Sequence, residues 1–552
     1  MNKRSLLIMI CLFGAARLIA QPAPKVRYWI QFKNKTGTPY ALNNPSAFLS
    51  APSIARRTAY NIPYHFSDLP VTPSYLQQID NVNHVDLLYA SKWLNGAVVA
   101  IDSSAVALAA LSAIKSFSFV LDTLKVKKIK LNKLPEVNAI DNAAKGSGSS
   151  DALSSVKYGK GTWQAYQLEV QCLHDRGYKG QGMTIAVCDV GFNDVNTGVL
   201  FDSIRKSGGI IGTRDFVAGG TNAYQGGDHG TMVFSCMAAN VPGLLVGTAP
   251  KAKYWLLRTE DGSSETLTEE YNWIRGAEFA DSVGADIITT SLGYTTFDNP
   301  IQNHTYQTLN GRKAPMSIAA TMAARKGMFL LNAAGNEGNS NWKYIGVPAD
   351  ADSICTVGAV DTTGALASFS SVGPTFDGRT KPDLLACGWN CYVSNDGVQV
   401  FPGSGTSFAT PVLAGAIACY WQACKSYNNM HLMDTLKKMA SNAATPNNTR
   451  GWGIPKLCNG ITSINKIEPD TEFDFNVYAN PNNNQITVNL NRTNFDKLSI
   501  CIFDAAGKIV FNNEYSSIDY KMLLNTVGLT SGVYLIQVQT SKGQKNKKLL
   551  KL

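Results

Sequence analysis

The sequence predicts an α/β domain with a mainly parallel sheet flanked by helices, preceded by a small α+β unit and followed by a β-sandwich. The 552 residues exceed the usual length of one domain, and with 45% hydrophobic and only 16% charged residues the chain can bury several cores. Apolar strands alternate with helical segments and Gly-rich loops over residues 158–466, as in parallel α/β domains. From residue 472 to 552 only short strands separated by turn signals remain.

The first segment, residues 1–20, reads as a secretory signal peptide. Lys3 and Arg4 precede an apolar run at 6–16, and the segment closes at Ala20. This run is shorter than the roughly 20 residues that a membrane-spanning helix needs. We therefore expect an exported mature protein with no transmembrane segment, in a compartment that permits disulfides.

Residues 21–150 form the second segment, for which we expect a small α+β domain. A basic run at 125–133 and a stretch of small residues at 142–150 follow it, and the latter is typical of a flexible linker. The expected boundary lies within 134–157. The expected strands are 26–32, 85–88, 96–101 and 117–120, and the expected helices lie near 73–78 and 105–113.

The last segment, residues 472–552, is expected to be a β-sandwich of about 80 residues. Turn signals such as Asn480-Pro-Asn-Asn-Asn and Asp504-Ala-Ala-Gly507 separate its strands. The expected strands are 475–478, 485–490, 498–503, 508–511 and 533–539.

The cysteines leave their pairing open. Cys387 and Cys391 are close enough in sequence to bridge a small loop, and this is the pair we consider. Cys188 and Cys236 are expected to be small buried hydrophobes within core elements.

Asp189 and His229 lie at positions where α/β domains commonly bind ligands. Asp189 ends the buried run Met183-Thr-Ile-Ala-Val-Cys-Asp, and ligands of parallel sheets bind beyond such strand ends. Taken alone, this residue is more often a strand-end cap than a catalytic group. His229 begins a helical run and is flanked by glycines, which leaves its ring accessible on a rigid element, as general-base catalysis requires.

Two further phrases could supply a nucleophile and an oxyanion donor. Ser407 follows a tight Gly turn and falls in the first turn of an apolar helix, where backbone N–H groups and the helix dipole favour a developing anion. Asn336 follows the apolar strand 330–334, and its amide could donate to that anion. A helix cap and a plain Asn-Gly loop are the simpler interpretations of these phrases.

Together, in the chain order Asp, His, Asn, Ser, these phrases resemble the subtilisin-like (S8) serine peptidases. The resemblance covers most of residues 165–460. One departure is Phe408 after the serine, where the family often has Met. The phrases that carry the resemblance are 180–189, Gly230-Thr231, 247–253, Ser291-Leu-Gly293, 334–338 and 405–411.

The resemblance implies a role for each site residue. Ser407 would be the nucleophile, His229 the general base and then acid, and Asp189 the group that orients the imidazole. Asn336 would donate to the oxyanion beside the Ser407 N–H. The residues expected to line the cleft and pair with an extended protein or peptide substrate are Ser291, Leu292, Gly293, Ala333, Ala334 and Gly335.

The flanking segments also gain an interpretation from the resemblance. Residues 21–150 would be a propeptide that assists folding and inhibits the active site. Residues 472–552 resemble the type A sorting domain of type IX secretion, on motifs that include Leu529-Thr-Ser-Gly-Val-Tyr and the final Lys547-Lys-Leu-Leu-Lys-Leu. The protein would then reach the medium or the cell surface of a Gram-negative bacterium, with the type IX machinery as a partner.

The net charge of +10 does not indicate nucleic-acid binding once it is located. It divides into +3 for residues 1–20, +7 for 21–157, −1 for 158–466 and +1 for 467–552. The excess lies in segments expected to be removed, so no nucleic-acid partner is predicted.

Three functions fit this sequence. The first is a secreted endopeptidase, the second a cell-surface binding protein on an inactive peptidase scaffold, and the third a peptide ligase with the same triad. We expect no cofactor. Structural calcium is common in the family, but no run here has the regular acidic spacing of a calcium loop, so calcium and other metals are assigned to no residue.

Overall fold

A computed structural model of the chain describes two compact units, divided between Ser463 and Ile464. The expected signal peptide at 1–20, the linker at 142–150 and the start of the C-terminal domain at 472 lie outside the described residues. The described residues are 25–102, 104–126, 157–459, 475–480, 485–490, 497–505, 507–516, 521–526, 528–540 and 543–551.

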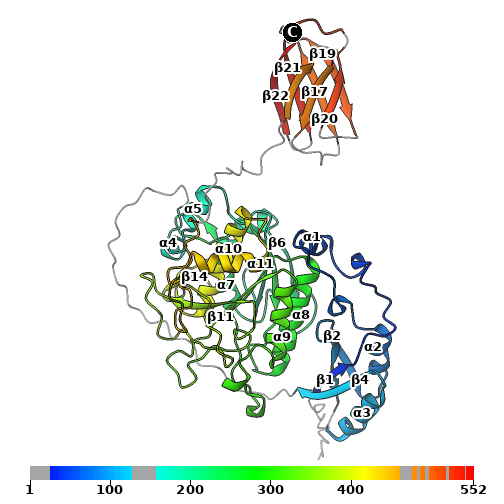
Figure 1. Cartoon of the computed structure of the whole chain (residues 1–552), viewed down its shortest axis with the longest axis vertical. Helices are drawn as coiled ribbons and strands as arrows, with labels where there is room; N and C mark the ends of the chain where they lie inside the picture. The colour runs from blue at the N-terminus through cyan, green and yellow to red at the C-terminus, as the bar shows by residue number, and fades with distance from the viewer. Residues whose placement is uncertain are drawn as a thin grey trace, which may run out of the picture. The chain divides into compact units, whose positions relative to one another are not determined.

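The centre of the first unit is a parallel sheet, as the sequence predicts (Figure 1). Each neighbouring pair of its strands runs parallel, and most strands are apolar at nearly every position because both faces are covered. Within the described residues its seven strands, in order across the sheet, are β13 (Leu384–Cys387), β12 (Cys355–Val360), β11 (Phe329–Ala333), β10 (Ile287–Thr290), β5 (Thr184–Asp189), β9 (Lys253–Arg258) and β6 (Ile210–Asp215).

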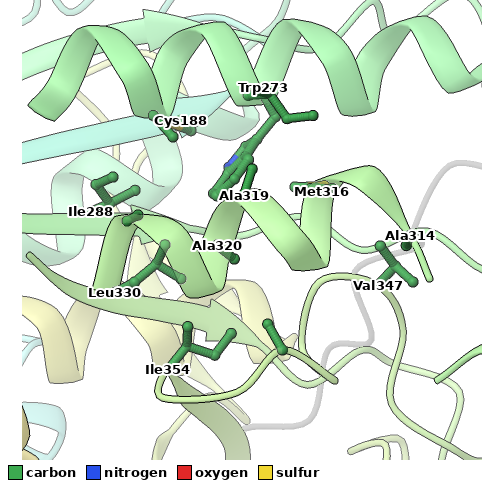
Figure 2. Close-up of a cluster of buried hydrophobic side chains, with 14 of the residues drawn as sticks. Cys188, Trp273, Ile288, Ala314, Met316, Ala319, Ala320, Leu330, Val347 and Ile354 are labelled. Atoms are coloured by element: carbon green, nitrogen blue, oxygen red, sulfur yellow. The ribbon is translucent and has the colours of Figure 1, made fainter. Parts of the chain in front are cut away.

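Helices α8 (Leu267–Val283) and α9 (Pro315–Arg325) cover one face of this sheet (Figure 2). A capping box between Thr266 and Glu269 begins α8, and Gly284 ends it with a φ of 82°. Trp273 of α8 is fully buried among alanines of α9 and side chains of the sheet, and its indole N–H donates to Thr290 at 2.9 Å. Packing in this core fixes the positions of β5, β10 and β11, and the candidate site residues lie at or after the ends of these strands.

Two helices whose first turns carry candidate site residues pack together. They are α7 (His229–Ala238) and α10 (Thr406–Ala423), and α10 also contacts the strands β10 to β13. The remaining elements of this domain are α4 (Thr162–Tyr166), α5 (Val170–Asp175), α6 (Asp202–Lys206), α11 (Asn429–Lys438), the hairpin pairs β7 (Asn240–Val241) with β8 (Leu245–Val246) and β14 (Cys391–Val393) with β15 (Phe401–Gly403), and the 3₁₀ turns 199–201, 300–302 and 306–308.

Residues 25–126 form a separate α+β layer beside α8 and α9 (Figure 1). The expected strand at 117–120 is wrong: residues 117–119 form the turn after α3, where Phe119 stacks on Tyr75 at 4.0 Å. The sequence also missed α1, whose buried residues are polar. The elements are β1 (Val26–Phe32), α1 (Ala51–Ala59), α2 (Pro73–Asp80), β2 (Val85–Ser91), β3 (Gly96–Ile101), α3 (Ser104–Ser116), β4 (Val120–Val126) and the 3₁₀ turns 45–47 and 66–68, with sheet order β2-β3-β1-β4.

The second unit is the expected β-sandwich, in which two antiparallel sheets enclose one apolar core. Two strands, β20 and β22, were not predicted, because β20 has only three apolar residues and β22 has only Leu549 and Leu550 among lysines and other polar residues. One sheet contains β16 (Phe475–Asn480), β17 (Gln485–Leu490) and β20 (Lys521–Asn525), and the other contains β19 (Ile509–Tyr515), β18 (Leu498–Phe503), β21 (Gly532–Thr540) and β22 (Gly543–Lys551).

The disulfide found among the described residues differs from the Cys387–Cys391 pair considered from the sequence. Cys172 pairs with Cys458 across 286 residues, and so joins the start of the α/β domain to its end. Cys387 and Cys391 are free and buried, and the Cys391 thiol donates to the Gln164 side-chain oxygen at 3.3 Å.

Cys188 and Cys236 are both free and fully buried, which confirms the expectation for them. Burial raises the pKa of the Cys188 thiol well above its ordinary value.

Candidate active site

Asp189 is the last residue of β5 and is fully buried. One of its carboxylate oxygens, Oδ1, accepts the backbone N–H of Val190 and the Nδ1 of His229, each at 2.8 Å. The other oxygen, Oδ2, is buried without a hydrogen-bond partner among the described residues. The carboxylate is therefore held by one backbone donor and one imidazole.

His229 is the first residue of α7, and its side chain is 32% exposed. The absence of a side chain at Gly230 allows this approach, because a Cβ there would lie 2.2 Å from the Gly191 carbonyl oxygen and 3.0 Å from the Asp189 Cβ. Phe408 covers one side of the imidazole, with ring centroids 6.1 Å apart. One ring nitrogen thus contacts the buried carboxylate while the other side of the ring stays accessible.

The surroundings of His229 raise the pKa of its imidazole. Burial opposes protonation, but the charge of Asp189 and the hydrogen bond to it favour the protonated ring more strongly, and Asp228 adds to the effect. The ring therefore binds a proton more readily than an ordinary histidine, as a base that must take a proton from an alcohol requires.

Ser407 lies in the first turn of α10, directly after the N-cap Gly405 and Thr406. Its hydroxyl donates to the backbone carbonyl of Ser291 at 3.2 Å, and the Ser291 hydroxyl donates back to the Ser407 carbonyl at 2.8 Å. The first N–H groups of a helix have no partner within it, and the helix dipole is positive at this end. An anion formed beside Ser407 would meet these donors.

Asn336 follows β11 and faces the same helix start. Its side-chain carbonyl accepts the Thr406 N–H at 2.9 Å and the Thr406 hydroxyl at 3.0 Å. A Cβ added to Gly405 would lie 3.7 Å from the Asn336 amide nitrogen and 3.8 Å from the Ser407 Cβ, so these two groups border one space. Because its oxygen is occupied, the amide can present only N–H donors there.

A cavity of about 80 Å³ opens beside Ser407. Five of the six residues expected to line a substrate cleft border it, and the sixth, Ala334, is fully buried with its N–H on Val357. The bordering residues are Ser291, Leu292, Gly293, Thr295, Ala333, Gly335, Asn336, Glu337, Gly346, Thr406 and Ser407.

Sequence reasoning missed four of these cavity residues: Thr295, Glu337, Gly346 and Thr406. Thr406 has the clearest local signal, since it stands between Gly405 and Ser407 in the phrase already singled out. Gly346 follows the phrase 334–338 by eight residues and belongs to no motif of its own, so the sequence around it does not indicate a site.

Within the part of the chain that the structure describes, no three His, Cys, Asp or Glu side chains gather in a way that could hold a metal ion. Calcium is assigned to none of the described residues, and no chemistry is derived through it. Among the same residues, no helix combines the length and apolar character needed to cross a bilayer.

Three parts of the chain match known protein families. Residues 27–141 match the peptidase S8 propeptide domain of Bacteroidota, residues 180–453 match the subtilase family, and residues 476–551 match the secretion system C-terminal sorting domain.

Curated relatives are similar to more than half of the chain. Subtilisin NAT of Bacillus subtilis subsp. natto and subtilisin E of Bacillus subtilis (strain 168) are each 31% identical over 326 residues, which is 58% of this chain and 74% of theirs. Subtilisin of Bacillus pumilus is 32% identical over 292 residues, which is 52% of this chain and 92% of its own.

Proposed function

Because the chain belongs to the subtilase family of serine peptidases, we propose that Asp189, His229 and Ser407 are its catalytic triad. The protein is a secreted subtilisin-like serine endopeptidase that carries an S8 propeptide and a type IX secretion sorting domain. The observation that supports the triad most directly is the 2.8 Å hydrogen bond from the partly exposed His229 to the buried Asp189.

The chemistry follows from the states of these three groups. A serine hydroxyl is a weak nucleophile until a base takes its proton during attack, and His229 has the raised pKa and the open ring edge for this step. Ser407 must turn its hydroxyl from the Ser291 carbonyl toward the imidazole, which is a rotation about one side-chain bond. Asp189 then stabilises the imidazolium, which returns the proton to the leaving amine.

The substrate carbonyl oxygen becomes an anion when Ser407 attacks. The Asn336 amide and the Ser407 N–H are the donors we assign to it, and Thr406 fixes the amide by occupying its oxygen. Ser291, Leu292 and Gly293 on one side, with Ala333 and Gly335 on the other, would hold the peptide in the cavity. Ala334 would act only as buried support for this wall.

Replacing Asn336 by alanine should lower kcat by about 10²–10³-fold and leave KM nearly unchanged, because the lost donor acts on charge that develops only in the transition state. The measurement is steady-state hydrolysis of a short peptide anilide. Asn339→Ala, an exposed residue of the same loop, is the matched control and should retain the wild-type kcat. A rise in KM with unchanged kcat would show that Asn336 binds substrate rather than the oxyanion.

A serine-directed fluorophosphonate tests the nucleophile. The purified protein, once its propeptide has been released, should hydrolyse casein and become labelled on the peptide that contains Ser407, and Ser407→Ala should do neither. The control is Ser404→Ala, three residues earlier, whose hydroxyl accepts the Asn390 N–H at 3.2 Å and takes no part in the triad. Wild-type protein that neither cleaves casein nor takes the label would overturn the proposed triad.

The pH dependence of kcat/KM should report the His229 imidazole. The base must be neutral to act, and Asp189 raises its pKa above the ordinary value of about 6.5. Activity should therefore rise with pH through an apparent pKa above about 6.5, measured with an uncharged peptide substrate. A midpoint below that value would contradict the assigned pairing of His229 with Asp189.

The family membership decides between the three functions considered from the sequence in favour of the peptidase, and an inactive binding scaffold is not retained. The propeptide at residues 27–141 and the sorting domain at 476–551 imply an intramolecular partner and the type IX secretion machinery. We propose further that the propeptide inhibits the active site until it is removed, and that extracellular proteins are the substrates.

A further inference from the structure

Three charged residues end neighbouring strands of the central sheet, and the proposed mechanism uses only one of them. Asp189, Arg258 and Asp215 are the last residues of β5, β9 and β6, and the strand register places Arg258 opposite both aspartates. Residues opposite one another in neighbouring strands point to the same face of the sheet. Arg258 therefore lies between the proposed catalytic carboxylate and a second buried carboxylate.

Arg258 is nearly buried and makes two directed contacts. Its side chain is 11% exposed, its Nη1 lies 2.9 Å from the Asp215 Oδ2, and its Nε donates to the Val190 carbonyl at 3.0 Å. Asp215 is itself fixed, since it also accepts the N–H groups of Val217 and Ala218 at 2.8 Å and the Gln225 amide at 3.0 Å. The guanidinium is thus anchored on one side and holds a backbone carbonyl on the other.

That backbone carbonyl belongs to the residue that holds the Asp189 carboxylate. The Val190 N–H donates to the Asp189 Oδ1 at 2.8 Å, and His229 is the other donor recorded on this oxygen. The Asp189 Oδ2 has no hydrogen-bond partner among the described residues, so Val190 is the single backbone group that orients the carboxylate there. A shift of Val190 would therefore change the angle at which Asp189 meets the imidazole.

Arg258 also lies where the segment after Asp189 touches the segment before His229. A Cβ added to Gly226 would lie 2.2 Å from the Arg258 Nε and 2.5 Å from the Val190 carbonyl oxygen. A Cβ added to Gly191 would lie 2.0 Å from the Gln225 carbonyl oxygen. No side chain separates the two segments at these points. A displacement of Arg258 would therefore move both the segment after Asp189 and the segment before His229.

We propose that Arg258 is a positioning residue for catalysis. It fixes the backbone of Val190 through its carbonyl, and the N–H of the same residue then holds the Asp189 carboxylate against His229. This inference rests on the proposed triad. Arg258 does not touch the substrate or the reacting atoms in this arrangement. Its planar fork directs one N–H to Asp215 and another to Val190, which a lysine ammonium cannot reproduce with the same geometry.

The test is Arg258→Lys in protein expressed as the full chain and then freed of its propeptide, with active sites titrated by the fluorophosphonate. This change keeps the positive charge, so it leaves the direct effect of that charge on the His229 pKa in place. We expect kcat to fall about 10–100-fold with KM unchanged, because a small misalignment of catalytic groups costs this much. We also expect the acidic limb of the pH profile to move to lower pH, because a weaker Asp189 contact raises the His229 pKa less.

Arg205→Lys is the matched control. Arg205 also directs its guanidinium onto backbone carbonyls, those of Val195 and Gly198 at 2.7 Å, but it makes no contact with Val190. It should lose a similar amount of thermal stability and keep the wild-type kcat and pH profile. A second variant, Gly226→Ala, introduces a Cβ against Arg258 without any change of charge, and it should reproduce both the loss of kcat and the shift of the acidic limb.

The outcomes separate the two proposals. Wild-type protein without the Ser407 label would overturn the triad. Labelled, active wild-type protein together with an Arg258→Lys variant that retains kcat, or that loses activity with the acidic limb unmoved, would overturn the positioning role alone. If Arg258→Lys does not fold, an unmoved limb in Gly226→Ala overturns it in the same way.

Discussion

Replacing Ser407 by alanine is expected to lower kcat by about 10⁶-fold, a loss comparable with removal of the nucleophile in subtilisin, and to leave only the rate that binding and the oxyanion donors sustain. The loss should affect kcat rather than KM, because the Ser407 hydroxyl is proposed to attack the substrate carbonyl, whereas the cavity walls that would hold the peptide stay in place. The measurement is single-turnover hydrolysis of a peptide anilide by purified protein.

A double mutant provides the control for this prediction. If Ser407 and His229 act as one unit, His229→Ala alone should cost about as much as Ser407→Ala, and the two changes together should cost little more. Losses that multiply in the double mutant would show that the residues act independently, and would contradict the proton transfer proposed between them. Ser404→Ala should keep the wild-type rate.

The four residues proposed for catalysis could be singled out from the sequence because each one lies in a short phrase with a local structural meaning. Asp189 ends an apolar strand, His229 and Ser407 begin helices after glycines, and Asn336 follows a strand. The order of strands and helices set the fold class in the same way. These signals depend on neighbours in sequence, so no knowledge of tertiary contacts was needed.

The features that the sequence did not reveal depend on contacts between distant residues. The Cys172–Cys458 disulfide spans 286 residues, whereas the pair considered from spacing was only four residues apart. Arg258 has no motif around it, and its position between Asp215 and Val190 follows only from the register of β5, β9 and β6. Such pairings become visible only when the strands are placed side by side.

Helix α1 shows the same limit in a different form. Its buried residues are Ser53, Arg56 and Arg57, so it has no apolar stripe for a periodicity argument to detect. These arginines are buried because acidic groups of α8 and of the same α+β layer meet them there. These buried ion pairs join α1 to the peptidase domain, so their loss should weaken the docking of the propeptide.

Replacing Asp281 by alanine should loosen the propeptide layer from the peptidase domain. Asp281 of α8 is fully buried, and it accepts the Arg56 guanidinium at 2.6 Å and the Arg57 guanidinium at 2.8 Å. Arg57 also binds Asp68 at 3.0 Å, and Lys326 of the peptidase domain pairs with Asp68. Removal of Asp281 leaves the buried Arg56 guanidinium without its carboxylate partner and Arg57 with Asp68 alone. Breaking such a buried ion pair costs about 3–5 kcal/mol.

The experiment compares hydrogen exchange in the Ser407→Ala chain with and without Asp281→Ala. The inactive background keeps the chain uncleaved, so the difference reports docking rather than processing. A cost of about 3–5 kcal/mol corresponds to an open population about 10²–10⁴-fold larger, and the amides of α1 and β2 should exchange faster by up to that factor.

Asp202→Ala is the control for the loss of a carboxylate, because Asp202 pairs with Lys206 at 2.8 Å on an exposed face of the peptidase domain, where ion pairs contribute little. It should leave exchange in α1 unchanged. Equal exchange in Asp281→Ala and Asp202→Ala would mean that apolar contacts such as the stacking of Trp29 on Tyr271, with ring centroids 4.8 Å apart, hold the propeptide without the buried charges. Faster exchange in Asp281→Ala alone would show that the charges of α1 and α8 determine how firmly the propeptide is held.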